Sequence, residues 1–514
     1  MPSVADVIFI GLLAALVLTP LSVKLLGDAG IGWHIRTGQL ILATHTIPKV
    51  DPFSSSMVGE AWFAWEWLYD VIVGQLEARL GLNGVVWLTA IVIALVFAGL
   101  FRGLVQRGVN VVISVLLTLL ALSASTIHFL ARPHLLSWLF TLIWFWILDA
   151  SERRSSDDGS NALSRRRLWI LPILMLVWVN VHGGFLVGFV LLAIFWIAAA
   201  WTWLSASDNR LEDALVRITA AKRLRDLLLL GLISTAASFL NPYGWKLHAH
   251  IYSYLTNSFL MNHIEEFQSP NFHGLAQKCF AILLVIVVGA LAIRRRELHL
   301  SAVLTVLFAI YSGLYASRNI PVSSILLVLA IVPLLSSTCS KWQFFSGMQQ
   351  IESNQRGHLW PIFAVVLTMA LAANAGRAGS STLMDAHFDP RRMPVEAVNY
   401  LQQHGVPGPL LSPDSWGGYL IYRLDTFRMD KDGIPPDRRV IIDDRHDLYG
   451  ETFLKSYLKM MHVERHWQDF LREHEPSCVL LPRDAALANV LLETRQWKPI
   501  YSDETAIAFV PISK

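Results

Sequence analysis

The chain has 514 residues, of which 54% are apolar and only 16% are charged, and it carries 19 tryptophans and a net charge of +3. Roughly a quarter of the residues of an ordinary soluble protein are charged, and here the apolar residues also form runs long enough to cross a bilayer. This composition excludes an ordinary soluble protein and predicts an α-helical multi-pass membrane protein.

The apolar runs predict about eleven spans. They cover residues 5–26, 84–101, 109–130, 135–150, 168–182, 185–204, 227–243, 277–293, 299–316, 320–337 and 359–376. The first run lacks the basic flank of a cleaved signal peptide, so we expect it to be retained. Alternate loops are rich in arginine and lysine, which predicts a cytoplasmic N-terminus in a cell inner membrane. We expect a transmembrane domain over residues 1–376, with a long first outer loop at 27–83.

Polar and aromatic residues gather in the loops predicted to lie outside. Besides the first outer loop, these are HFLARPHLLSW (128–138), WVNVHGG (178–184), SFLNPYGWKLHAH (238–250), NHIEEFQSPNFHG (262–274) and YASRNIP (315–321). Residues that only solubilise loops would not favour one side of the membrane. Ionisable groups at membrane depth are costly, and they tend to be paired or functional. The pattern predicts a cavity at the outer leaflet that several spans build together.

Asp28 is the first acidic residue after the first span, and it precedes an amphipathic helix predicted over GWHIRTGQLILATH (32–45). A carboxylate there could act as general base on an acceptor hydroxyl or bind a metal ion, and helix N-capping is the structural alternative. On the same helix, His34 could ligate a metal or share a proton. Arg36 could bind a phosphate, or it could simply face lipid head groups.

Two further carboxylates lie in the first outer loop. The stretch IPKVDPFSSS predicts a turn in which Asp51 binds the backbone near Ser54, and a second catalytic carboxylate remains an alternative. Glu66 follows in AWFAWEWLYD, among tryptophans typical of a membrane interface. Its aromatic surroundings predict a basic partner such as Arg132.

Four basic residues occupy the predicted outer ends of spans, namely Arg132, His134, His182 and Arg318. Any one of these side chains could simply extend its charged end to the membrane interface without binding a specific ligand. Together they suit the phosphate of a lipid carrier, because guanidinium groups bind phosphate oxygens in pairs.

Residues 377–514 break the apolar pattern and predict a small extracytoplasmic α/β domain. PVEAVNYLQQHG is typical of a helix, and two more helices are expected near 451–473 and 484–494. Strands are expected in PLLSP, RRVIIDD, SCVLLP, WKPIYS and TAIAFVP. The segment Asp443-Asp444-Arg445 follows a predicted strand, where ligand sites of α/β proteins often form. A local ion pair between these residues is the structural alternative to ligand binding.

The chain contains no GxxxxGK[ST] loop, GxGxxG fingerprint, HExxH or paired CxxC, which argues against an ATP-driven pump. A transporter or flippase of lipid-linked cargo would need polar groups through the depth of its spans, whereas their inner halves look dry. No repeat relates the two halves of the chain, which also weakens that alternative. A non-catalytic envelope assembly protein is the other alternative.

The loop with Asp28 directly after the first span, the helix behind it, the spans and the outer C-terminal domain resemble the GT-C superfamily of membrane glycosyltransferases. The segments WHIRTGQLIL, IPKVDPFS and WFAWEWL resemble sequences from a bacterial branch of that superfamily. The resemblance implies transfer of a sugar from a polyprenyl-phosphate donor to a lipid, glycan or protein acceptor. We therefore expect the bilayer, this donor and this acceptor as partners, and no nucleic acid.

The resemblance also implies roles for single residues. Asp28 would activate the acceptor hydroxyl, with His34 supporting it or sharing a divalent cation, and Arg132 and Arg318 would bind the carrier phosphate. Many members carry an adjacent acidic pair in this loop, whereas Ala29 follows Asp28 here. A second carboxylate would have to come from elsewhere in the loop, which leaves metal dependence open.

Overall fold

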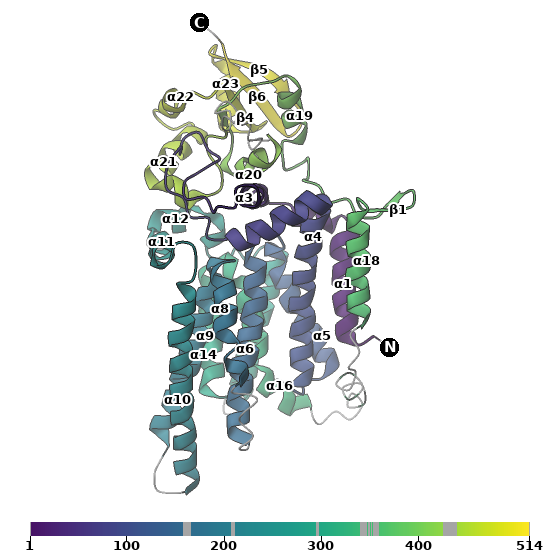
Figure 1. The fold of residues 1–514 in the computed structure, drawn as a ribbon, viewed down its shortest axis with the longest axis vertical. Coiled ribbons are helices and arrows are strands. Elements are labelled where there is room, and N and C mark those ends of the chain that lie inside the picture. Colours follow the sequence, from purple (N-terminus) through teal and green to yellow (C-terminus); the bar gives the residue numbers. More distant parts are fainter. Residues whose placement is uncertain are drawn as a thin grey trace. The chain divides into compact units, whose positions relative to one another are not determined.

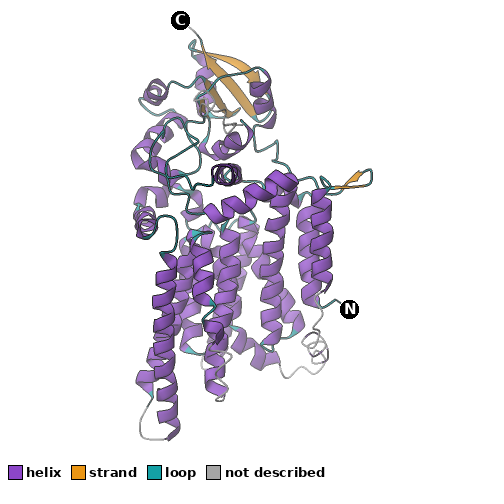
Figure 2. Cartoon of the chain, viewed as in Figure 1, coloured by secondary structure: helices purple, strands orange, loops and turns teal. Residues whose placement is uncertain are grey.

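The structure, a computed structural model, describes residues 2–157, 166–206, 211–294, 298–339, 359–424 and 439–512, with single positions at 347, 350 and 352. In these ranges the chain is mostly helical, with a small sheet near its C-terminal end (Figure 2). The chain divides into two compact units. The first comprises Met1–Ala14, Ala90–Phe129 and Pro133–Leu367, and the second Ala15–Thr89, Leu130–Arg132 and Thr368–Lys514.

The first unit is built from helices, most of which are labelled in Figure 1. They are α5 (Val111–Ser125), α6 (His134–Asp157), α8 (Leu171–Val179), α9 (Leu186–Ser205), α10 (Leu211–Ser238), α11 (Trp245–Thr256), α12 (Ser258–His263), α13 (Leu275–Arg294), α14 (Leu300–Tyr315), α15 (Ile320–Ala330) and α16 (Val332–Cys339). Three further helices, α1 (Val4–Leu18), α4 (Trp67–Gln106) and α18 (Leu359–Ala373), contribute residues to both units.

In the described part of the chain, five helices are long and apolar enough to cross a membrane, and four apolar helices are shorter. The five are Trp67–Gln106, Val111–His128, His134–Arg153, Gly183–Ser205 and Leu275–Ile293. Helices suit this setting because they satisfy their own backbone hydrogen bonds without water. The helices agree with a multi-pass membrane protein, and the number of eleven spans stays a prediction.

Charged side chains lie at the end of the predicted span 135–150 and just beyond it, in the second half of α6. Asp149 forms ion pairs with Arg107 at 2.9 Å and with Arg153 at 2.7 Å. One turn further on, Glu152 lies 3.3 Å from Arg223 of α10. Each carboxylate has a basic partner, which offsets part of the cost of burying charge. Ion pairs within α6, with Arg107 and with α10 therefore account for these residues.

The second unit contains a four-stranded sheet in the order β3-β4-β6-β5. The strands are β3 (Leu410–Leu411), β4 (Cys478–Pro482), β5 (Trp497–Ser502) and β6 (Ala506–Pro511). β3 runs parallel to β4, and the other two pairs are antiparallel. Its helices are α2 (Leu21–Leu25), α3 (Ile31–Thr44), α19 (Val395–Gln403), α20 (Asp414–Arg423), α21 (His446–Met461), α22 (Gln468–His474) and α23 (Ala486–Glu493), with a β1–β2 hairpin (Arg377–Ala378, Ser381–Thr382).

A short stretch of the segment 27–83 extends this sheet. Val440 forms parallel bridges with Leu410 on one side and with Ser54 on the other. The Ser55 N–H donates to the Val440 carbonyl at 2.8 Å, and the Ser56 hydroxyl donates to the Ile441 carbonyl at 2.5 Å. Of the predicted strand over RRVIIDD, residues 439–444 are described and form only bridges, which join the segment 27–83 to the C-terminal region.

Helices α3 and α20 cross where both carry glycine. A Cβ atom added to Gly32 would lie 2.1 Å from the Gly418 carbonyl oxygen, and one added to Gly418 would lie 2.4 Å from the Ala29 carbonyl oxygen. Small residues allow two helix backbones to approach this closely. The crossing holds α3, and the turn before it, against the C-terminal region.

We expect the Gly418→Ala variant to be less stable by about 1–3 kcal/mol, because the added methyl group overpacks the crossing. Thermal unfolding of the full chain in detergent measures this. The matched control is Gly289→Ala in α13, where nothing lies within 4 Å of the new Cβ, and where alanine favours the helix. Equal unfolding temperatures for Gly418→Ala and the wild type would contradict the tight crossing.

Candidate functional site

Asp28 lies in the turn between α2 and α3. Its Oδ1 accepts a hydrogen bond from the Gly30 N–H at 2.8 Å, an arrangement typical of an Asx turn before a helix. The same Oδ1 lies 2.5 Å from Nη2 of Arg132. The carboxylate is thus held from two sides, although 30% of its side chain remains exposed. The N-cap of α3 is Gly30, without a side-chain cap, so Asp28 forms a turn before the helix and does not cap it, and its carboxylate remains accessible.

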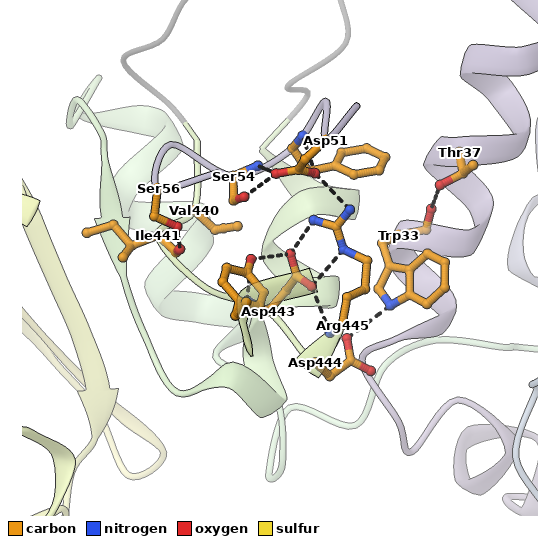
Figure 3. A network of polar contacts seen from close by, with 12 residues as sticks. Trp33, Thr37, Asp51, Ser54, Ser56, Val440, Ile441, Asp443, Asp444 and Arg445 are labelled. Carbon is orange, nitrogen blue, oxygen red and sulfur yellow. Dashed lines mark hydrogen bonds and ion pairs between the residues drawn. The ribbon is translucent and has the colours of Figure 1, made fainter. Parts of the chain in front are cut away.

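Arg132 binds two carboxylates of the second unit. Its Nη2 lies 2.5 Å from Asp28 Oδ1 and 2.5 Å from Asp444 Oδ2. Asp444 Oδ1 in turn accepts the Trp33 indole N–H at 3.0 Å (Figure 3). A Cβ atom at Gly30 would lie 2.2 Å from Arg132 Nη2 and 2.4 Å from Asp444 Oδ2. Glycine at position 30 therefore leaves the room in which the two acidic groups share one guanidinium.

The pKa of the Asp444 carboxyl group is raised. Burial raises the pKa of Asp444 to about 6, with the negative charges of Asp28 and Asp443 acting in the same direction and Arg132 acting against them. Burial disfavours the charged form of a carboxyl group, which explains the direction. Asp444 therefore changes between its protonated and ionised forms at a pH only slightly below neutral.

A buried ion network holds the turn that carries Asp444 (Figure 3). Arg445 donates from Nε and Nη2 to the two carboxylate oxygens of Asp443, at 2.8 and 2.6 Å, and from Nη1 to Asp51 Oδ1 at 2.8 Å. The Tyr449 hydroxyl also donates to Asp443, at 2.9 Å. The side chain of Arg445 is 2% exposed, and those of Asp51 and Asp443 are fully buried. The network fixes the backbone on both sides of Asp444.

The predicted turn at Asp51 is confirmed. Its two carboxylate oxygens accept the N–H groups of Phe53 at 3.1 Å and Ser54 at 2.9 Å. Asp51 Oδ1 also accepts a hydrogen bond from Arg445 Nη1. Asp51 therefore joins the segment 27–83 to the C-terminal region, and the second carboxylate that contacts Arg132 beside Asp28 is Asp444.

The residue after Arg445 forms another ion pair. His446 Nε2 lies 2.7 Å from Asp414 Oδ2. Burial acts to lower the pKa of His446, but the hydrogen bond and charge of Asp414 outweigh it and raise this pKa. Burial acts to raise the pKa of Asp414, and the bond to His446 outweighs it and lowers that pKa. The folded protein thus favours the charged form of both groups.

This pair predicts a pH dependence of stability. The contribution of His446 is complete below its unfolded pKa of about 6.5 and is lost as the pH rises through its higher folded pKa. That of Asp414 is complete above about pH 4 and is lost as the pH falls through its lower folded pKa. We expect urea unfolding of the full chain to give about 1 kcal/mol more stability at pH 6 than at pH 8.5. Asp414→Asn should reduce this difference, and an unchanged difference would contradict the assignment.

His34 is fully buried on α3 and stacks on Trp33, with ring centroids 3.6 Å apart. Its Nδ1 lies 2.6 Å from Asp70 Oδ1, and its Nε2 lies 3.7 Å from Glu66 Oε2. The structure thus brings His34 and Glu66 together, and a ring between two carboxylates is well placed to share a proton. The catalytic role of either residue stays a prediction.

Arg36 lies against the C-terminal end of α20. Its Nε donates to the Tyr422 carbonyl at 3.0 Å, its Nη1 donates to Gln39 Oε1 at 2.8 Å, and its guanidinium lies 5.2 Å from the centroid of the Tyr422 ring. Cations are favoured beside the last carbonyls of a helix. These bonds compete with the predicted binding of a phosphate, which stays a prediction.

The first unit brings His134 and His182 together, with ring centroids 6.5 Å apart. His134 Nε2 lies 2.9 Å from the His128 carbonyl oxygen. His182 Nδ1 lies 2.8 Å from the Ser137 hydroxyl and 3.0 Å from the Gly184 nitrogen, which donates to it. His182 Nδ1 therefore acts as an acceptor, so its proton is assigned to Nε2.

Arg318 also belongs to the first unit. Its Nη1 lies 3.2 Å from Glu266 Oε1, and its guanidinium lies 4.4 Å from the centroid of the Phe267 ring. The ion pair is partly exposed, with 28% of the Arg318 side chain accessible. Binding of a carrier phosphate by Arg318 stays a prediction.

The described residues contain no group of three or more His, Cys, Asp or Glu side chains that could hold a metal ion. Arg132 lies between Asp28 and Asp444, where a cation would have to sit. Asp70 occupies His34 Nδ1. The residues present therefore do not fit the divalent cation that was one alternative for Asp28 and His34.

A cavity of about 620 Å³ is also found in the second unit. Its lining mixes three basic and two acidic side chains, so its charge favours neither a phosphate nor a cation. None of the predicted site residues lines it. The lining residues are Arg391, Arg392, Trp416, Pro482, Arg483, Asp484, Glu504 and Thr505.

Sequence reasoning singled out Asp444 but did not place it beside Arg132, and it did not predict the contact of Trp33 with Asp444. Asp444 lies in the segment that follows a predicted strand, and this position at a strand end is the sequence feature that pointed to it. Trp33 is one of many tryptophans at predicted membrane interfaces, and nothing in its neighbourhood distinguished it. Their partners lie far away in the sequence.

No protein-family model and no curated protein sequence matches this chain, but solved structures do. The archaeal oligosaccharyltransferase AglB from Archaeoglobus fulgidus, in complex with an inhibitory peptide and a dolichol-phosphate, aligns with a TM-score of 0.57 and 10% identity, over 99% of this chain and 74% of its own. The apo form of the Archaeoglobus fulgidus oligosaccharyltransferase aligns with a TM-score of 0.56 and 11% identity, over the same shares. ArnT from Cupriavidus metallidurans bound to undecaprenyl phosphate aligns with a TM-score of only 0.46 and 13% identity, over 99% of this chain and 97% of its own.

Proposed function

The chain has the fold of the GT-C membrane glycosyltransferases, and from this fold and its site we propose that it is such an enzyme. It transfers a hexosyl or pentosyl group from a polyprenyl-phosphate-linked donor to a lipid, glycan or protein acceptor. The reaction takes place at the outer face of the inner membrane. In this proposal residues 1–376 form the membrane domain, with the loop 27–83 outside, and residues 377–514 form an extracytoplasmic domain.

The observation that carries the proposal is the fixed and accessible carboxylate of Asp28. The Gly30 N–H and the Arg132 guanidinium both bind its Oδ1, which orients the group before any substrate arrives. A preoriented base is effective because its geometry need not be organised during the reaction. The AglB complex supports the donor class, since that protein was solved with a dolichol-phosphate.

The proposed reaction is a displacement at the anomeric carbon. The acceptor oxygen forms a bond to that carbon while its proton passes to Asp28, and the bond between the carbon and the phosphate oxygen breaks. The carrier phosphate leaves with the electron pair, and guanidinium groups stabilise its charge. We assign this phosphate contact to Arg132 and Arg318, and further substrate contacts to His134 and His182.

Incubation of the purified chain in lipid nanodiscs with a panel of polyprenyl-phosphate sugars tests the proposal. Mass spectrometry should detect free polyprenyl phosphate and a glycosylated acceptor in equal amounts. Movement of intact donor across the bilayer without cleavage would favour the flippase alternative. Neither cleavage nor movement with any donor would favour an assembly protein.

A further inference from the structure

Arg132 is shared by two carboxylates from distant parts of the sequence. We propose that Asp444 is the second acidic residue of the site and acts through Arg132, releasing its guanidinium to an anionic phosphate ligand when it takes up a proton. This inference rests on the proposed function. It concerns a positioning residue, because Asp444 acts on Arg132 and not on the reacting atoms.

The charges around Arg132 oppose the binding of a phosphate. In the structure one guanidinium faces two carboxylates, and Nη2 contacts both at 2.5 Å. A phosphate that approached this nitrogen would meet a neighbourhood with an excess of negative charge, and like charges a few ångströms apart repel strongly in a partly buried site. Arg132 therefore cannot serve a phosphate well while both carboxylates are ionised.

Protonation of one carboxylate removes this obstacle, and Asp444 is the better candidate. Its side chain is 14% exposed, against 30% for Asp28, and burial favours its neutral form. The groups that act on Asp444 are Arg132, Asp28, Asp443 and His446, together with the Trp33 indole N–H. A proton from solvent on Oδ2 ends the ion pair with Arg132, and Oδ1 continues to accept from Trp33.

The fold holds Asp444 in place for this role. Its neighbours on both sides are anchored, since Asp443 and Arg445 bind each other and Arg445 also binds Asp51. Gly30 has no side chain to separate Asp444 from Arg132. Loss of the ion pair therefore leaves the turn in position and changes mainly the availability of the guanidinium.

A binding measurement tests the inference without requiring sugar transfer. The probe is a polyprenyl methyl phosphate diester, whose single negative charge stays constant in the range used, and its affinity is measured in nanodiscs between about pH 5 and pH 8. We expect the wild type to bind on the order of ten times more tightly as the pH falls through the pKa of Asp444. Asp444→Asn should bind tightly throughout, with a flat pH profile.

Two further variants keep the test decisive. Trp33→Phe removes the N–H donor to ionised Asp444, so the midpoint of the wild-type pH profile should move to higher pH. Trp33→Phe therefore tests the role of Asp444 even if the Asp444→Asn variant fails to fold. Asp484→Asn, an exposed residue of the same unit, should leave the profile unchanged.

The outcomes separate the two proposals. A pH-dependent wild type with an identical profile in Asp444→Asn would overturn the role of Asp444 and leave the proposed function standing. A wild type that binds with no pH dependence would also overturn it. Absence of binding by the wild type at every pH would overturn both proposals.

Discussion

Asp28→Asn is expected to lower the rate of sugar transfer by a factor on the order of 10² to 10⁴. The amide cannot accept the proton of the acceptor hydroxyl, whereas its oxygen can still accept the Gly30 N–H that the carboxylate binds at 2.8 Å. The turn before α3 should therefore form normally. The measurement is the rate of polyprenyl phosphate release in nanodiscs, with the donor that the wild type uses.

The control is Asp484→Asn, which removes an exposed carboxylate of the same unit and should retain nearly the wild-type rate. Unfolding temperatures of both variants close to that of the wild type would show that the fold is intact. A wild-type rate in Asp28→Asn would eliminate this residue as the catalytic base.

Steady-state kinetics distinguish a base from an indirect role through Arg132. Loss of a base lowers kcat, because proton transfer belongs to the transition state. If Asp28 served only to hold Arg132, its loss would change mainly the KM for the donor, with kcat nearly intact. The first pattern is the one that the proposed function requires.

Elements with strong local patterns could be predicted from the sequence. The helix over GWHIRTGQLILATH is α3 (Ile31–Thr44), and the strands SCVLLP, WKPIYS and TAIAFVP are β4, β5 and β6. In these stretches the period of apolar residues matches a helix or a strand and is bounded by turn residues. The Asp51 turn was predictable for the same reason, since its hydrogen bonds are local.

Contacts between distant segments could not be predicted. Helix α20 contains two adjacent glycines, which disfavour a helix by themselves, and it is stabilised by its crossing with α3 at Gly418. Val440 forms only bridges because its partners are Leu410 and Ser54, and Ser54 comes from the distant segment 27–83. No local pattern places Asp444 beside Arg132. That pairing follows from the meeting of three segments, which only the tertiary structure displays.

Arg445→Met should destabilise the second unit by about 3–5 kcal/mol. Arg445 is the basic partner of two buried carboxylates, Asp51 and Asp443, and methionine fills much of its volume without its charge. A buried carboxylate that loses its partner retains the full cost of desolvation. We expect the protease-sensitive opening of residues 377–514 in the full chain to occur at lower urea concentration, as pulse proteolysis in detergent would measure.

The matched control is Arg391→Met, in which the arginine lost is 87% exposed and paired with Asp389. An exposed pair contributes little, so this variant should lie within about 1 kcal/mol of the wild type. A double variant that combines Arg445→Met with Asp51→Asn should recover part of the loss, because one of the two unpaired charges is removed. Equal stability of Arg445→Met and Arg391→Met would mean that the buried network does not hold the segment 27–83 to the C-terminal region. Asp444 would then lack the fixed backbone on which its position beside Arg132 depends.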